Sequence, residues 1–152
     1  MEGTLRLLEP LAEASNVTIS CELAEDCVVR ATEDDIYHIV FNLVENAVKY
    51  NLAKGSVFVT VARAGERCRL TVEDTGIGIP EADRPHVFTR FYRVDKARSR
   101  EHGGSGLGLS IVHDAVKLYG GTVAVEGVKP HGTRFVVESP AAPGGGAVRE
   151  AD

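Results

Sequence analysis

The chain has 152 residues, which suits one domain and is enough to enclose a substantial hydrophobic core. Its hydrophobic content of 43% and charged content of 26% are typical of a soluble globular protein, and a formal net charge of -5 gives it no overall attraction to nucleic acid. The cysteines form no C-x-x-C pair and are too few for a disulfide scaffold, so we expect reduced thiols in a cytoplasmic protein at Cys21, Cys27 and Cys68.

The first half of the chain predicts two helices and four strands. They cover residues 4–14, 17–23, 27–30, 33–51, 56–62 and 67–73. Thr32 caps the longer helix, and Asp35 follows it as the acid of a capping box. In the last strand apolar and polar residues alternate, which indicates a hairpin with one buried face. The amphipathic, acidic start is not typical of a signal peptide, and no apolar run could span a membrane, which leaves open an anchor elsewhere in a parent protein.

The second half begins with an irregular segment, residues 75–106, that is Gly-rich at both ends and basic in the middle. A segment of this kind inside a compact domain indicates a functional loop. A helix from about Leu109 to Tyr119, stopped by two glycines, and strands over 121–126 and 132–138 follow. We therefore expect an α/β fold over residues 1–140, a two-layer sandwich with helices on one face of a mixed, mostly antiparallel sheet. The Pro- and Gly-rich tail, 141–152, is expected to be flexible.

A polar stripe runs along the helix at 33–51. Asn42, Asn46 and Lys49 recur at helical spacing, with Tyr50 between this stripe and the apolar face. Asparagine is a poor helix former, so two of them one turn apart need a reason. The stripe is either a solvated face or a site for metal and phosphate, since amide oxygens are hard ligands that suit magnesium.

Asp74 shares the inward parity of the apolar residues in the strand before it. Burying an unpaired carboxylate is costly, so its side chain should either cap the following turn or accept a hydrogen bond from a ligand. Gly76 and Gly78 come directly after it and would let a flat ring approach the backbone.

Glycines also open the second strong helix. Gly104, Gly106 and Gly108 expose backbone N–H groups at a helix start, which is typical of a phosphate site but also of a hinge. Before them, aromatic residues alternate with basic ones over residues 88–100. Such interleaving occurs in nucleic-acid binding, which the net charge disfavours, and in mobile lids over phosphates.

Together, four motifs resemble a known family. NLVENAVKY (42–50), DTGIGIP (74–80), VFTRFYRVD (87–95) and GGSGLGLSIV (103–112) are similar, in order and spacing, to the N, G1, F and G2 boxes of histidine kinases. GTRFVVESP (132–140) resembles the closing strand of the same domain, and the similarity covers about residues 16–140. The F box is typical of histidine kinases rather than of their wider ATPase superfamily.

The resemblance implies a site for ATP and Mg²⁺. It implies that Asn46 holds the metal, that Asn42 supports metal and nucleotide, and that Lys49 contacts phosphate. Asp74 would accept from the adenine amino group, with Thr133 behind it through water. The implied nucleotide contacts, including phosphate-wrapping glycines and lid arginines, are completed by Tyr50, Gly76, Gly78, Ile79, Arg90, Arg93, Gly104, Ser105, Gly106, Leu107 and Gly108.

The resemblance also implies an enzyme without its own acceptor. His113-Asp114 is the nearest imitation of an acceptor histidine, but it lies inside a helix and lacks the following proline, so we interpret it as a solvated helix position. Hydrolytic relatives place a glutamate where Asn42 stands, and Glu45 should face solvent. We expect phosphoryl transfer to a histidine of a separate dimerisation domain, to which residues 1–15 would lead, and a response regulator downstream.

Two alternatives remain open at this point: a serine kinase of the anti-sigma-factor type, and a module that binds ATP without phosphotransfer. The chain by itself is expected to be monomeric.

Overall fold

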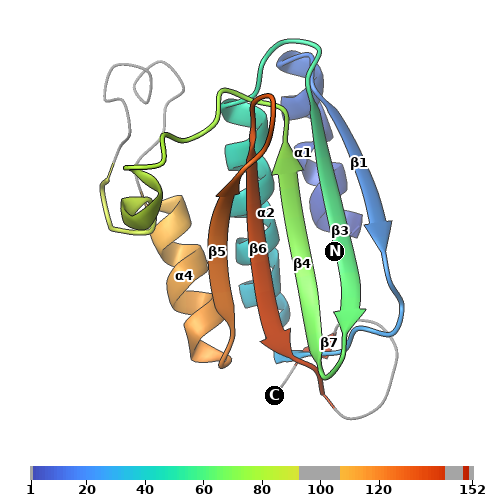
Figure 1. The fold of residues 1–152 in the computed structure, drawn as a ribbon. Coiled ribbons are helices and arrows are strands. Elements are labelled where there is room, and N and C mark those ends of the chain that lie inside the picture. Colours follow the sequence, from blue (N-terminus) through green and yellow to red (C-terminus); the bar gives the residue numbers. More distant parts are fainter. Residues whose placement is uncertain (1, 93–106, 143–148, 151–152) are drawn as a thin grey trace.

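A computed structural model describes residues 2–92, 107–142 and 149–150 of the chain (Figure 1). These residues form a two-layer α/β architecture, in which three helices cover one face of a five-stranded sheet. The helices are α1 (Glu2–Ala14), α2 (Glu33–Lys49) and α4 (Gly108–Leu118). The strands of the sheet are β1 (Thr18–Leu23), β3 (Ser56–Ala64), β4 (Arg67–Asp74), β5 (Thr122–Gly127) and β6 (Thr133–Pro140). The predicted fold class is confirmed.

The strand order is β1-β3-β4-β6-β5. β1 runs parallel to β3, and the other three pairs are antiparallel. The register aligns Asp74 at the end of β4 with Val57 on β3 and with Thr133 on β6. The last residue of β4 therefore lies between two strands that are far apart in the sequence.

The core lies between the sheet and the helices. Alternate residues of β3 and β4, together with Phe135 of β6, are buried against the apolar faces of α2 and α4. The opposite face of the sheet carries charged side chains, among them Arg134, which pairs with Glu73 at 2.7 Å and Glu126 at 3.3 Å. Because only one face of the sheet is apolar, helices cover only that face.

Local sequence signals explain the boundaries of α2. The hydroxyl of Thr32 accepts a hydrogen bond from the Asp35 amide at 3.1 Å, which confirms the predicted cap. The helix ends at Lys49, two residues earlier than predicted, because Tyr50 leaves the helical conformation at φ -101° and ψ 18°. The chain then turns directly into β3.

The short elements differ from the prediction. The strand expected at 27–30 forms only as β2 (Arg30–Ala31), because Cys27 and Val28 are both buried and so cannot alternate between two faces. β2 pairs with β7 (Arg149–Glu150), although no element was predicted in the tail. A 3-10 turn, η1 (Arg84–His86), forms inside the segment expected to be irregular. Among the described residues, none of the helices is both long and apolar enough to cross a membrane.

Candidate functional site

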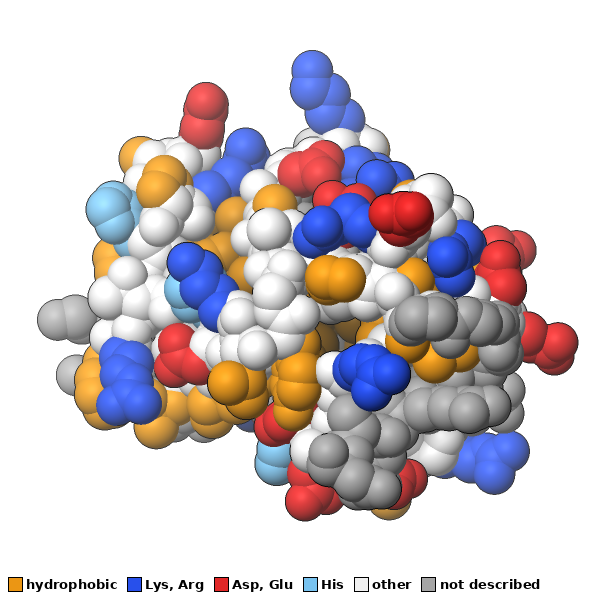
Figure 2. Space-filling view, turned by 90° about the horizontal axis from the view of Figure 1, so that it is seen from below, with side chains coloured by type: hydrophobic (Ala, Val, Ile, Leu, Met, Phe, Trp, Pro, Cys, Tyr) orange, Lys and Arg blue, Asp and Glu red, His pale blue; other side chains and the backbone are white. Residues whose placement is uncertain are grey.

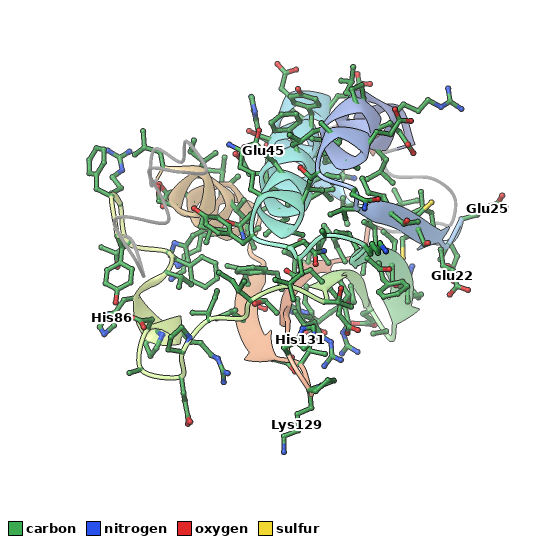
Figure 3. All side chains as sticks on the ribbon, turned by 90° about the horizontal axis from the view of Figure 1, so that it is seen from above. Glu22, Glu25, Glu45, His86, Lys129 and His131 are labelled. Atoms are coloured by element: carbon green, nitrogen blue, oxygen red, sulfur yellow. The ribbon has the colours of Figure 1, made fainter. Side chains whose placement is uncertain are left out.

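Polar residues from both layers meet at one end of the molecule. The end of β4, the start of β6 and the C-terminal end of α2 lie at the top in Figure 1, and the N-terminal end of α4 points toward the same end from lower down. Figure 3 looks down on this end and shows Glu45 on α2, in the helix layer, and His131 on the sheet side. The site is therefore built from elements that pack against each other through the core.

Asp74 is the most deeply buried charged residue of the site, with 3% of its surface exposed. Its Oδ1 accepts hydrogen bonds from the backbone N–H groups of Gly76 at 2.8 Å and Thr133 at 3.2 Å. Burial raises the pKa of Asp74 to about 6, and the two amide hydrogen bonds oppose this rise. Within the described residues, the other carboxylate oxygen, Oδ2, has no hydrogen-bond partner. Because every fully buried side-chain oxygen or nitrogen among these residues has a partner, Oδ2 is not fully buried and can accept a hydrogen bond from a ligand.

The inward parity predicted for Asp74 is confirmed, and so is the face that Thr133 shares with Phe135 and Val137. Thr133 also contacts Asp74 through its backbone, because its N–H donates directly to the carboxylate at 3.2 Å.

Two glycines in this region have no room for a side chain. A Cβ on Gly76 would lie 2.4 Å from the Tyr50 carbonyl oxygen, and one on Gly132 would lie 2.1 Å from the Asp74 carbonyl oxygen. Gly132 also has a φ of +131°, which an L-residue rarely adopts. Gly76 and Gly78 were singled out from the sequence. Gly132 was missed, although its place directly before Thr133 was a usable signal.

The stripe on α2 faces the start of α4. The amide nitrogen of Asn42 donates to the His38 carbonyl at 2.7 Å, and its oxygen would lie 3.1 Å from a Cβ placed on Gly108. Among the described residues, the half-buried amide of Asn46 makes no hydrogen bond, which leaves its oxygen available to a ligand. The fold thus brings Asn42 and Gly108 together.

Lys49 and Glu45 form an ion pair one turn apart. The Nζ–Oε1 distance is 3.6 Å, and both side chains are partly exposed. Glu45 was expected to face solvent; it is half-buried at the edge of the stripe and engaged with this lysine. A phosphate would have to compete with a carboxylate for Lys49.

Several predicted contacts lie at the margin of the site or beyond the described residues. Ile79 is half-buried, and its carbonyl accepts from Arg84 Nε at 3.1 Å. Leu107 precedes α4 and accepts from the Ser110 hydroxyl at 2.8 Å. Arg90 is exposed. The other four predicted contacts lie outside the described residues: Arg93, Gly104, Ser105 and Gly106.

His113 is not the fully solvated position that the sequence suggested. Its ring stacks on Phe88, with centroids 5.7 Å apart, and Phe88 also meets Phe135 edge to face. The aromatic residue at the start of the F motif therefore anchors this segment to α4 and the core, a role that aromatic pairs commonly have.

A cavity of about 250 Å³ lies at the opposite end of the molecule. Its walls include Ala31, Ile39, Val116, Tyr119 and Pro140. Figure 2 views this end from below and shows hydrophobic side chains around a hollow. None of the predicted site residues lines it.

The fold and the site together define a two-layer α/β domain in which a buried carboxylate at the end of β4 lies at the same end of the molecule as the polar stripe of α2. A family model described as "Histidine kinase-, DNA gyrase B-, and HSP90-like ATPase" matches residues 31–143. The sensor histidine kinase RppB of Synechocystis is 37% identical over 131 residues, and WalK of Bacillus subtilis is 39% identical over 117 residues. These matches cover 86% and 76% of this chain, but only 29% and 19% of those proteins.

Solved structures agree with the sequence comparisons. The mycobacterial sensor histidine kinase MprB superposes with a TM-score of 0.80 at 30% identity, over 93% of this chain and 95% of that one. Full-length ShkA in complex with AMPPNP gives 0.75 at 30% identity, over 93% of this chain and 29% of that one. The chain therefore belongs to the histidine kinase-, DNA gyrase B- and HSP90-like ATPase family, and the relatives named here are sensor histidine kinases, of which it matches one part.

Proposed function

We propose that this chain binds Mg–ATP and transfers the γ-phosphoryl group to a histidine on a separate dimerisation domain, in two-component signal transduction. The observation that carries the proposal is Asp74, a buried carboxylate with one oxygen held by two amides and the other available. A group of this kind selects a ligand that donates a hydrogen bond, as the adenine amino group does. Gly76, Gly78, Ile79, Tyr50 and Thr133 would line the base.

Asn46 is the proposed metal ligand. Its amide oxygen is hard and makes no hydrogen bond within the described chain, which suits Mg²⁺. Mg²⁺ is commonly held by one or two protein oxygens plus substrate phosphates, so a single amide fits its needs. When bound, the ion would offset phosphate charge. Asn42 would support nucleotide and metal, and Lys49 would contact phosphate after leaving Glu45.

The side chains of Asn42 and Glu45 on α2 favour phosphoryl transfer over hydrolysis. An amide at Asn42 cannot act as a general base toward water, and Glu45 is engaged with Lys49. A neutral imidazole is already nucleophilic, so positioning and charge stabilisation would supply most of the catalysis. His113 is stacked on Phe88 and is not proposed as an acceptor.

The remaining contacts and partners are proposed on the family resemblance. Leu107 and Gly108 would hold phosphates together with Gly104, Ser105 and Gly106, while Arg90 and Arg93 would belong to a lid that closes over them. The partners would be the dimerisation domain of the same kinase and a response regulator. The chain alone would be a monomer, and its parent a cytoplasmic or membrane-anchored kinase.

The nucleotide half of the proposal is tested by calorimetric titration. Asp74→Asn should weaken ATP binding by on the order of 1.5–3 kcal/mol, because a charged, buried hydrogen bond is lost, while GTP should not be penalised. Asn46→Ala should lose the response of ATP binding to Mg²⁺ and keep the metal-free binding. Unchanged ATP affinity in Asp74→Asn would contradict the assignment of the base site.

The transfer half is tested with γ-labelled ATP. The chain alone should not become labelled, and label should appear only after a matching acceptor domain is added. Transfer should be slow, because untethered domains lack the roughly millimolar effective concentration that a linker provides. Acid-labile, base-stable label on the acceptor identifies phosphohistidine. Acid-stable label would identify a serine kinase, and binding without any transfer would leave an ATP-binding module.

A further inference from the structure

We infer that Asn51 and Thr75 form a joint that fixes the distance between the base end and the phosphate end of the site, and that both are positioning residues for a ligand that occupies both ends. The inference rests on the proposed nucleotide site. Neither residue was singled out by its sequence, and neither touches the free oxygen of Asp74 or the amide of Asn46 in the described chain.

The joint is a closed ring of hydrogen bonds at the start of β3. The Ser56 N–H donates to the Thr75 hydroxyl at 2.9 Å, and that hydroxyl donates to Asn51 Oδ1 at 3.3 Å. The Asn51 amide nitrogen donates to the Ser56 carbonyl at 2.9 Å, and the same carbonyl accepts from the Thr75 N–H at 3.2 Å. Only a side chain that both donates and accepts can close this ring at position 75.

The backbone around the ring has little freedom to shift. The Ile77 N–H donates to the Tyr50 carbonyl at 3.1 Å. A Cβ on Gly76 would lie 2.4 Å from that carbonyl oxygen, and one on Gly55 would lie 2.2 Å from Asn51 Oδ1. The turn after β4 and the turn after α2 are thus in direct contact, which the absence of a side chain at Gly76 makes possible, while Gly55 leaves room for the Asn51 side chain within the second turn.

The two turns carry the two ends of the site. Thr75 directly follows Asp74, whose carboxylate is oriented independently by the Gly76 and Thr133 amides. Asn51 directly follows the last turn of α2, which carries Asn46 and Lys49. A ligand that contacts only one end does not sense the joint, whereas a ligand that spans both requires them at a fixed separation. A preformed separation lowers the cost of ordering the site on binding.

The experiment compares Thr75→Val with Thr75→Ser in the full chain, using three probes: Mg–ATP, adenosine and Mg–tripolyphosphate. Valine keeps the shape of threonine and cannot donate or accept, whereas serine keeps the hydroxyl. Thr75→Val should weaken Mg–ATP binding by about tenfold, the size expected for one lost hydrogen bond. Adenosine and tripolyphosphate should each stay within about twofold of wild type, and Thr75→Ser should bind all three probes as wild type does.

A role limited to general stability would weaken all three probes alike, and that result would overturn the inference, as would unchanged Mg–ATP binding in Thr75→Val. Wild-type protein that binds neither ATP nor adenosine would instead refute the proposed function, and the joint with it. A measurement on wild type guards against a variant that does not fold: the Ser56 and Ile77 amides should be protected from hydrogen exchange without nucleotide. Rapid exchange of both amides would show that the joint is not preformed.

Discussion

The raised pKa of Asp74 links its role to a cost in stability. The folded state holds the proton up to about pH 6, whereas the unfolded state releases it near 3.8. The folded state therefore binds more protons between these values, and at neutral pH the ionised carboxylate lowers the free energy of unfolding. We expect Asp74→Asn to raise the free energy of unfolding at pH 7 by on the order of 1–3 kcal/mol, while it weakens ATP binding.

Urea unfolding at a series of pH values tests this prediction. The advantage of Asp74→Asn should be largest above pH 6 and should shrink as the pH falls toward 3.8, below which the wild-type carboxyl is protonated in both states. Asp35→Asn is the matched control, for which we expect the opposite change in the free energy of unfolding, since hydrogen bonds from Tyr119 and Thr32 lower the pKa of Asp35. That variant should be less stable than wild type at neutral pH. Equal stability of Asp74→Asn and wild type at pH 7 would show that the ionised Asp74 carboxylate does not destabilise the folded state.

The backbone conformation of Gly132 leads to a second prediction about a single residue, a loss of stability on substitution. Its φ of +131° and the closeness of the Asp74 carbonyl leave no place for a methyl group. Gly132→Ala should lower the free energy of unfolding by at least about 2 kcal/mol. Gly65→Ala is the control, because Gly65 has a positive φ of +64° but no atom near a Cβ, so about 1 kcal/mol is expected there. Thermal unfolding of both variants measures the difference, and equal losses would contradict the clash.

The sequence could predict a site residue where the pattern that reveals it lies within one segment of the chain, and could not where it depends on a distant segment. The inward direction of Asp74 could be predicted because strand parity is local, and the polar stripe that holds Asn46 could be recognised because helical spacing is local. Gly132, Asn51 and Thr75 were missed because their roles depend on contacts between separate segments, such as the Asp74 carbonyl against Gly132. No periodicity within a single segment reports such contacts.

At the scale of elements, α2 and α4 are tied together at the end opposite to the site. The Tyr119 hydroxyl, just after α4, donates to the Asp35 carboxylate in the first turn of α2. Tyr119→Phe should lower the free energy of unfolding by about 1 kcal/mol at pH 7, since Asp35 is only half-buried and water can partly replace the bond. The loss should shrink in acid as Asp35 becomes protonated, because its lowered pKa stabilises the fold only while it is ionised.

Tyr37→Phe serves as the control for this prediction. The Tyr37 ring stacks on Phe41 at 5.4 Å, but its hydroxyl makes no hydrogen bond with any described residue. Chemical unfolding should therefore show little change in Tyr37→Phe. If both variants lose the same stability, the Tyr119 hydroxyl contributes nothing specific.

The elements themselves were predicted well where the pattern was long. The alternation in β3 and β4 and the apolar stripe of α2 each extend over several repeats, and these elements were found within two residues of their bounds. η1 and β7 were missed, because a turn of three residues and a strand of two contain no full period.

At the scale of the whole molecule, the layers could be predicted and the strand order could not. β6 pairs with β4, although η1, α4 and β5 come between them in the chain, and β1 pairs in parallel with β3 across α2. Pairing of this kind depends on closing long loops, which leaves no local trace in composition or periodicity.

The antiparallel arrangement of α2 and α4 has an electrical consequence. Tyr119 near the end of α4 meets the start of α2, and Gly108 at the start of α4 meets Asn42 on the later half of α2. The two helices therefore present opposite poles at the site, each equivalent to about half a unit charge. The negative pole of α2 favours a cation beside Asn46 and Lys49, and the positive pole of α4 favours an anion. Before any ligand arrives, the backbone alone separates charge in the sense that a metal–phosphate pair requires.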